Sequence, residues 1–169
     1  MNYYRRIGDF GIRFAVEQDS GYILSFIKEL AEYEKLGGEV VATEESLKET
    51  IFVRKQAEVI IGEENGLPVA FALFFHNYST FLGKAGMYLE DLFVLEAYRG
   101  RGYGKQMFKC LGAIAAERGC GRLDWWCLDW NKLSIDFYLK MGAKDMKDWT
   151  VYRLQGDALA ALASEGTIG

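Results

Sequence analysis

The stretch YLEDLFVLEAYRGRGYGKQMFK, which runs from Tyr88 to Lys109, decides the fold of this chain. Residues Tyr88 to Leu95 interleave leucine, phenylalanine and valine with a single acidic pair, which predicts a buried strand. Residues Arg99 to Gly104 then form a glycine-spaced turn. After the turn, apolar residues from Met107 to Ala115 recur at the spacing of one helical face. A strand, a glycine loop and a helix in this order indicate an anion-binding site.

The glycine loop suits an anion for two physical reasons. Glycines lack a Cβ atom, so successive backbone N–H groups can converge on one oxyanion. The helix that follows adds free N–H groups and the positive end of its dipole, which favour a phosphate or pyrophosphate. The chain has a formal net charge of −4, yet this segment holds cations and no acid: Arg99, Arg101, Lys105 and Lys109. The alternative is a solvated turn whose basic residues only keep it soluble.

Two better-known phosphate loops do not fit the glycine spacing. A Walker A loop would need glycine and serine or threonine at the positions of Arg99 and Gln106. The dinucleotide pattern GxGxxG fails because the glycines fall at 100, 102 and 104. The remaining pattern, R-x-x-G-x-G between a strand and an amphipathic helix, resembles the acetyl-coenzyme A pyrophosphate loop of the GNAT N-acetyltransferase superfamily.

The composition indicates one globular domain. Half of the 169 residues are apolar, which is enough for a substantial core. We expect an N-terminal extension over residues 1–10 and one α/β domain over residues 11–169, with a mixed, mostly antiparallel sheet flanked by helices. No apolar run approaches the ~20 residues of a membrane span and no signal-like segment follows the N-terminus, so we expect a cytoplasmic protein without membrane contact. The acidic excess argues against nucleic-acid binding.

Three cysteines, Cys110, Cys120 and Cys127, have spacings that match neither a zinc site nor a disulfide framework. Reduced structural thiols and no metal are the expectation in a cytosolic chain. The alternative is that Cys127 accepts an acetyl group covalently. That thiol would need a base partner, and the one histidine, His76, lies in an apolar strand.

Turn and cap signals place the other elements. Asn65-Gly66 predicts a β-hairpin, Asp19 and Ser20 are candidate helix caps, and Thr43 can cap a second helix. The expected strands cover residues 11–16, 57–62, 69–75 and 122–128, with a closing antiparallel pair at 143–148 and 149–154. The first expected helix runs from the Asp19 and Ser20 caps to about residue 33, and the second begins at Thr43. A third runs from the glycine loop to about residue 119, and a fourth from the Asn131 cap to Gly142. A short alanine-rich helix is expected at the C-terminal end.

A second informative segment, DWNKLSIDFYLKMGA, runs from Asp129 to Ala143. Asn131, Ser134 and Tyr138 share one face of its expected helix. From spacing alone, Tyr138 would be a core aromatic with a satisfied hydroxyl. The Asn-x-x-Ser-x-x-x-Tyr pattern, however, resembles the other coenzyme A segment of the same superfamily. With IKELAEYEK, FLGKAGMYLEDLFV and YRGRGYGKQMFK, it is similar to the spermidine/spermine and thialysine N-acetyltransferase branch from about Ile12 onward.

This resemblance implies a homodimer of mixed α/β domains that transfers the acetyl group of acetyl-CoA to a primary amine by direct attack. It also implies that a central strand splays from its neighbour, so that the backbone of Leu92, Phe93 and Val94 pairs with the pantetheine arm. The pyrophosphate is expected on Arg99, Gly100, Arg101, Gly102, Tyr103, Gly104 and Lys105, and further coenzyme A contacts on Asn131, Ser134 and Tyr138.

The same resemblance implies the catalytic roles. Tyr138 is the general acid, because a phenol with a reference pKa of about 10 stays protonated at neutral pH and can protonate the departing thiolate. Glu90 is the candidate base, acting through ordered water. The alternative is that Glu90 attracts a cation or satisfies backbone donors. Asp91 is expected to attract the substrate.

Tyr33, Glu34 and Phe81 match residues that line the amine site of the family. Polyamine enzymes carry acids where this chain has Ser79 and Thr150, so a diamine or a thialysine-like amino acid becomes as suitable as spermine. We therefore expect transfer to a polyamine, a diamine or a thialysine-like amino acid. The alternatives are an aminoglycoside or protein amine as acceptor, and a non-catalytic regulatory module that binds coenzyme A. The sequence leaves open the kinetic order and whether a dimer shares its active site.

Overall fold

The computed structural model describes residues 3–166 and divides them into two compact units, residues 3–126 and 127–166. The first unit holds a six-stranded sheet in the order β1-β2-β3-β4-β5-β6. Its strands are β1 (Arg5–Ile7), β2 (Phe10–Phe14), β3 (Glu58–Glu64), β4 (Leu67–Ser79), β5 (Lys84–Val94) and β6 (Leu123–Trp125). All neighbouring strands are antiparallel except β5 and β6, which are parallel. The expected mixed, mostly antiparallel α/β architecture is confirmed.

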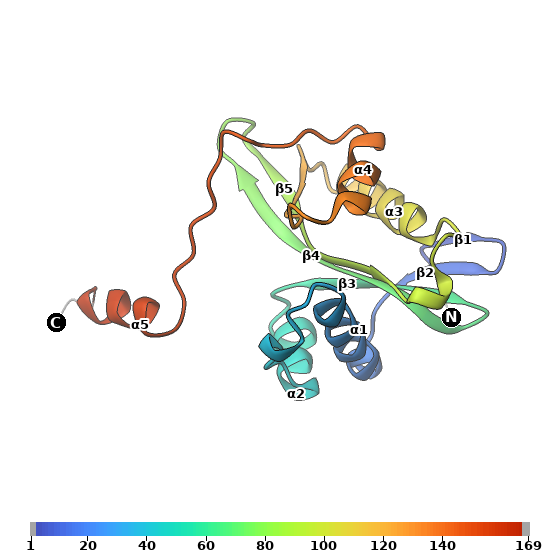
Figure 1. The fold of residues 1–169 in the computed structure, drawn as a ribbon, viewed down its shortest axis with the longest axis horizontal. Coiled ribbons are helices and arrows are strands. Elements are labelled where there is room, and N and C mark those ends of the chain that lie inside the picture. Colours follow the sequence, from blue (N-terminus) through green and yellow to red (C-terminus); the bar gives the residue numbers. More distant parts are fainter. Residues whose placement is uncertain (1–2, 167–169) are drawn as a thin grey trace. The chain divides into compact units, whose positions relative to one another are not determined.

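Helices cover both faces of this sheet (Figure 1). α1 (Ser20–Tyr33) and α2 (Glu44–Leu47) lie on one face, and α3 (Tyr103–Glu117) lies on the other. α2 begins at the predicted Thr43 cap, whose hydroxyl oxygen accepts a hydrogen bond from the amide of Ser46, and it continues into a π-helical segment. The remaining short elements are Glu17–Asp19, Gly37–Glu39, Lys48–Val53 and Glu96–Tyr98.

The alternation of side chains along the strands builds a separate core on each face. On β3, Ile60 packs in the α3 core, whereas Val59 and Ile61 pack in the core beneath α1. Phe26 of α1 stacks on Phe71 of β4 with ring centroids 5.2 Å apart. Fully burying an apolar side chain of this size contributes about 1.5–3 kcal/mol, so these contacts fix α1 and α3 on opposite faces.

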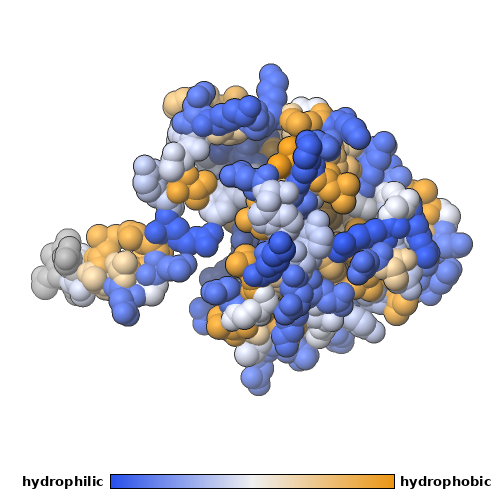
Figure 2. Space-filling model, in the orientation of Figure 1, coloured by the Kyte–Doolittle hydropathy of each residue, from blue (hydrophilic) through white to orange (hydrophobic). Residues whose placement is uncertain are grey.

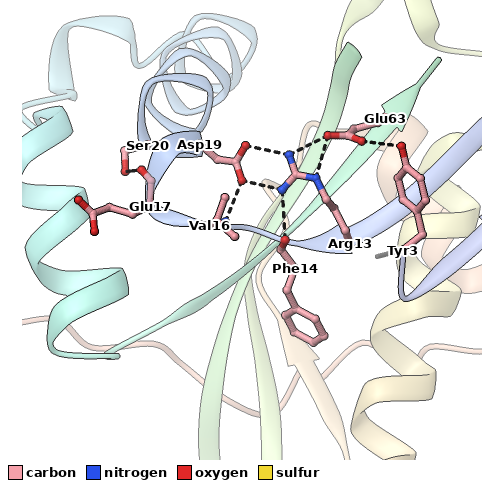
Figure 3. Close-up of polar contacts among 8 residues, drawn as sticks. All are labelled: Tyr3, Arg13, Phe14, Val16, Glu17, Asp19, Ser20 and Glu63. Carbon is pink, nitrogen blue, oxygen red and sulfur yellow. Dashed lines mark hydrogen bonds and ion pairs between the residues drawn. The ribbon is translucent and has the colours of Figure 1, made fainter. Parts of the chain in front are cut away.

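A buried arginine ties the start of α1 to the sheet (Figure 3). The Arg13 guanidinium, on β2, donates to both carboxylate oxygens of Asp19 at 2.6 and 2.8 Å and to Glu63 on β3 at 2.8 Å. The Tyr3 hydroxyl also donates to Glu63. Burial alone would raise the pKa of Asp19, but hydrogen bonds from Arg13 and the Val16 amide outweigh it and hold the pKa below its usual value. Asp19 is the N-cap residue of α1, as predicted, but its carboxylate binds Arg13 and the Val16 amide and makes no hydrogen bond to an amide of the helix.

The central segment of the chain forms the predicted strand and hairpin. Asn65 and Gly66 join β3 to β4 with φ angles of 52° and 82°, as an Asn-Gly turn requires. β5 contains the strand expected at Tyr88 to Leu95 as far as Val94, but only Leu89 and Phe93 in that range are buried. It is a half-buried strand, because Glu90 is exposed and Asp91 is only partly buried.

The second unit contains α4 (Lys132–Lys140) and α5 (Gly156–Glu165), which confirms the two predicted C-terminal helices. The antiparallel pair expected at 143–148 and 149–154 is wrong, because these residues form no strand. A turn breaks the segment where the Trp149 amide donates to the Met146 carbonyl. Leu159 and Leu162 of α5 are exposed, and Figure 2 shows apolar surface over this helix. No helix within residues 3–166 is long and apolar enough to cross a membrane.

Candidate active site

The glycine loop presents a row of free amides at the start of α3. Gly100 and Gly102 have φ angles of 76° and 83°, the left-handed region that favours glycine. Within the part of the chain that the structure describes, no protein acceptor takes a hydrogen bond from the amides of residues 100–105. The first amides of a helix have no partner inside it and lie at its positive end. The loop backbone can therefore bind a phosphate or pyrophosphate.

The side chains of Arg101 and Tyr103 brace this loop against β3. The Arg101 guanidinium donates to Glu64 at 3.0 Å, and the Tyr103 hydroxyl donates to the same carboxylate. The Tyr103 ring also stacks on Phe10 at 4.0 Å. The expected phosphate contacts of these two side chains stay predictions, because their polar groups bind Glu64. The role of Glu64 was not predicted from the sequence. Its position as the last residue of β3, directly before the Asn-Gly turn, is the sequence signal that could have indicated it.

The Arg99 side chain turns from the loop toward α1. Its Nε donates to the Val94 carbonyl at 3.0 Å, and its guanidinium carbon lies 4.8 Å from the Tyr33 ring centroid and 5.1 Å from that of Phe93. Arg99, Tyr33 and Phe93 line an open cleft of about 520 Å³. The rest of the lining is charged and was not predicted: Lys28, Glu29, Glu32 and Glu96. Helical spacing could have predicted that Lys28, Glu29 and Glu32 lie on the exposed face of α1. It could not have predicted that this face lies next to Arg99.

β5 offers a free backbone edge next to the glycine loop. Its parallel pairing with β6 ends at Leu89, and no strand among residues 3–166 pairs with that side of β5 over residues 90–94. Leu92 and Val94 pack against the α3 core, and Phe93 is buried in the core beneath α1. The side chains of these residues are therefore used for packing, while their backbone groups on the free edge can bind an extended ligand.

A β-bulge sets the acidic pair beside this edge. Leu73 of β4 pairs with Asp91 and the next residue, Phe74, pairs with Leu89, so Glu90 is left without a partner on β4. The Glu90 side chain is exposed, and Asp91 is partly buried. The bulge thus points two adjacent carboxylates in different directions from one strand.

Asp91, Glu90 and Glu34 form an acidic group in the first unit. Burial is the main cause that raises the pKa of Asp91 to about 7, and the charges of Glu90 and then Glu34 raise it further. Burial also raises the pKa of Glu34, which follows Tyr33 at the end of α1. Carboxylates that repel one another in a partly buried place are stabilised by a cation. An ammonium group is the cation that this arrangement suits.

Phe81 does not join this acidic group. It is 97% exposed in the turn between β4 and β5. Asp91 lies near the other end of β5, about 23 Å along the strand from its first residue, Lys84, at 3.3 Å per residue. Ser79 is buried in the same turn, where its hydroxyl accepts a hydrogen bond from the Leu82 amide. The predicted role of Phe81 in binding the acceptor stays a prediction.

Asn131, Ser134 and Tyr138 belong to the second unit. The Asn131 side chain accepts a hydrogen bond from the Ser134 amide at 3.3 Å and begins α4, as predicted. Tyr138 lies on α4 with its ring centroid 5.3 Å from that of Phe137. Cys127 lies in this unit and donates weakly to the Leu128 carbonyl at 3.8 Å. The pattern that predicted coenzyme A contacts therefore lies on a capped helix.

Known proteins resemble this chain over most of its length. The model of the acetyltransferase (GNAT) family matches residues 24–143. Thialysine N-epsilon-acetyltransferase of Bos taurus is 39% identical over 166 residues, which cover 91% of this chain and 97% of the relative. L-ornithine N5-acetyltransferase of Arabidopsis thaliana is 32% identical over 89% of this chain and 86% of its own. An integron cassette protein of V. cholerae has a solved structure with a TM-score of 0.78 and 28% identity, covering 92% of this chain and 98% of that one.

Proposed function

Because the chain belongs to the acetyltransferase (GNAT) family and is an acetyl-CoA-dependent N-acetyltransferase, we propose that its acceptor is the terminal amine of a small molecule. The leading candidate is an amino acid of the lysine or ornithine type, and a diamine or polyamine is the second. One observation carries this proposal: Glu34, Glu90 and Asp91 form an acidic group beside the free edge of β5. The names of the relatives, which specify thialysine and ornithine, support the same acceptor class.

We propose that the backbone of the first unit holds acetyl-CoA. The amides of residues 100–105 are suited to its pyrophosphate, with Gly100, Gly102 and Gly104 keeping side chains out of the way. The free edge of β5 from Leu92 to Val94 is suited to the amide groups of the pantetheine arm. Lys105 is exposed on the first turn of α3 and adds positive charge there.

The acidic group prepares the acceptor amine. An ammonium must lose its proton before its nitrogen lone pair can attack the thioester carbonyl. Asp91, with a pKa of about 7, can take that proton near neutral pH, and the exposed Glu90 can pass it on through water. Attack then forms the C–N bond and breaks the C–S bond, which leaves coenzyme A as a thiolate.

We propose Tyr138 as the acid that protonates this thiolate. The support is the Asn131, Ser134 and Tyr138 pattern on α4, together with the high reference pKa of a phenol. Asn131 and Ser134 would add contacts to coenzyme A from the same helix. Cys127 has no role in this direct transfer, which needs no covalent acetyl-enzyme.

A cytoplasmic homodimer completes the proposal. Exposed aromatic residues in the second unit, Trp149 and Tyr152, would suit contacts with another copy of the chain. Light scattering of the purified protein tests this assembly, and a monomeric mass at micromolar concentration would contradict it.

The test of function is the release of free coenzyme A from acetyl-CoA, followed with a thiol reagent. We expect turnover with L-thialysine, L-ornithine or both, compared with putrescine, spermidine, an aminoglycoside and no acceptor. Tyr138→Phe should lower kcat while the affinity for acetyl-CoA is kept, because only the proton donor is lost. Tight acetyl-CoA binding without turnover on any amine would contradict the proposed acceptor class and favour a regulatory module.

A further inference from the structure

We propose that the active site also accepts arylalkylamines, in which two or three carbons separate the primary amine from one aromatic ring. This inference rests on the proposed function and adds a class of acceptor to it. The observation that carries it is an aromatic wall, formed by Phe75, Tyr88 and Trp126, beside the acidic group of the first unit.

The aromatic wall is built on β4, β5 and the end of β6. Phe75 pairs directly with Tyr88, and their ring centroids lie 5.1 Å apart. Trp126 follows the last residue of β6, and its ring meets the Tyr88 ring edge-on at 5.9 Å. Phe75 and Tyr88 are half-buried, whereas Trp126 is 53% exposed. The contacts orient the rings, and the indole still presents apolar surface that a ligand can cover.

The register of β4 places this wall on the same face of the sheet as Asp91. Leu73 and Phe75 are two residues apart on β4, so their side chains point to the same face about 7 Å apart. Leu73 pairs with Asp91, and Phe75 pairs with Tyr88. Since Leu73 packs in the core beneath α1, the wall lies on the α1 face. Figure 1 shows the hairpin end of β4 and β5 extending beyond α1 and α2, which leaves these helices too short to cover it.

This spacing suits an amine and a ring that are joined by a short chain. An ammonium held by the carboxylates of Glu90 and Asp91 has the wall as its neighbour along the strand, because the β-bulge at Glu90 separates Asp91 from Tyr88. Two or three carbons, at about 1.5 Å per bond, cover the step of about 7 Å between the two positions once the ring itself is included. The amine then keeps its ionic partner while the ring is taken from water.

A polar group closes the far end of the wall. The Asn77 side chain donates to the Asp124 carboxylate at 2.9 Å, and Arg122 pairs with the same carboxylate at 2.7 Å. Asp124 pairs with Tyr88, and Asn77 follows Phe75 by two residues on β4, so both belong to the same face. An apolar ring pushed onto this group would desolvate it without replacing its hydrogen bonds. The wall therefore suits one ring on a short chain.

The test compares an amine with the same amine lacking its ring. Phenethylamine and ethylamine are assayed by coenzyme A release, with L-ornithine and L-thialysine in parallel. The variants are Trp126→Leu and Phe75→Leu, which remove aromatic rings from the wall. The matched control is Tyr78→Leu, because Tyr78 is 62% exposed on β4 and points to the opposite face. The KM for acetyl-CoA and the mass by light scattering are measured for each protein.

We expect the wild type to use phenethylamine with a kcat/KM about tenfold or more above that for ethylamine, because the ring is buried. Trp126→Leu and Phe75→Leu should each lower this ratio by about twofold to tenfold, mainly through the KM for phenethylamine, because an aromatic contact is lost. Tyr78→Leu should keep the wild-type ratio. Phenethylamine turnover without turnover of ornithine or thialysine would support the inference and remove the leading acceptor.

Three results would overturn this inference while the proposed function survives. The first is a wild type that acetylates ornithine or thialysine but uses phenethylamine no better than ethylamine. The second is a pair of wall variants that keep the wild-type ratio. The third is an equal loss of all amines, with a raised KM for acetyl-CoA or a lower mass, which would assign the wall to the donor or to another copy of the chain. If no amine is acetylated, the proposed function fails first and the inference fails with it.

Discussion

Removing the Arg13 guanidinium should destabilise the first unit strongly. Arg13, Asp19 and Glu63 are 6%, 5% and 1% exposed, and within residues 3–166 the arginine is the cation that pairs with both carboxylates. Arg13→Met would leave two carboxylates buried without a countercharge. Breaking a buried pair in this way costs about 3–5 kcal/mol, against a typical total stability of about 5–15 kcal/mol. We therefore expect the variant to lose a large part of its stability.

Urea unfolding at pH 7, followed by tryptophan fluorescence, measures this loss. The matched control is Arg54→Met, which removes an arginine from an exposed pair with Glu49 at 2.9 Å. Exposed pairs contribute about 0–1 kcal/mol, so the control should unfold close to the wild type. An Arg13→Met variant within 1 kcal/mol of this control would refute the reasoning that the buried network is a charge balance.

The pH dependence adds an independent check. The pKa of Asp19 is lowered in the folded state, so its contribution is present above its unfolded pKa of about 3.9 and is lost as pH falls through the folded pKa. The carboxylates of Arg13→Met can instead be relieved by protonation at higher pH. The gap in stability between wild type and variant should shrink as the pH is lowered from 7 toward 4. A gap that stays constant over this range would contradict the proposed cause.

Three further changes address the site itself. Asp91→Asn should remove the rise of kcat/KM with pH near 7. Because the pKa of the Asp91 carboxyl is raised in the folded protein, its ionised form destabilises the fold at pH 8, so the same variant should have a higher Tm at that pH. Gly102→Ala forces a left-handed φ of 83° and should raise the KM for acetyl-CoA, whereas Gly112→Ala, inside α3, should not. Glu64→Gln weakens the brace on Arg101 and Tyr103, and calorimetry should show weaker acetyl-CoA binding. An unchanged affinity would exclude that role.

Local signals in the sequence were enough for much of the first unit. Helix caps, the Asn-Gly turn and the glycine loop depend on neighbours within a few residues, so Thr43, Asn65 and Gly102 predict their own conformations. The strand pair predicted at 143–154 is wrong because strand formation depends on distant residues and not on local signals. A strand needs a partner to satisfy its backbone N–H and C=O groups, and the alternation of residues cannot say whether such a partner exists. The turn at Met146 and Trp149 interrupts that segment.

The site shows the same division between local and distant information. The glycine loop can be predicted from the sequence because its function depends on backbone amides and left-handed φ angles, and glycine residues at this spacing favour both. The direction of the Arg99 side chain depends on the Val94 carbonyl and on Tyr33, which is separated from Arg99 in sequence by α2 and the strands β3, β4 and β5. Two arginines in one loop therefore read alike in sequence, yet one is bound to Glu64 and the other faces the cleft. Their charges can be counted from the sequence, but their partners are set by the fold. For this reason the Glu64 partner of Arg101 and the Tyr33 and Phe93 rings beside Arg99 could be assigned only from the structure.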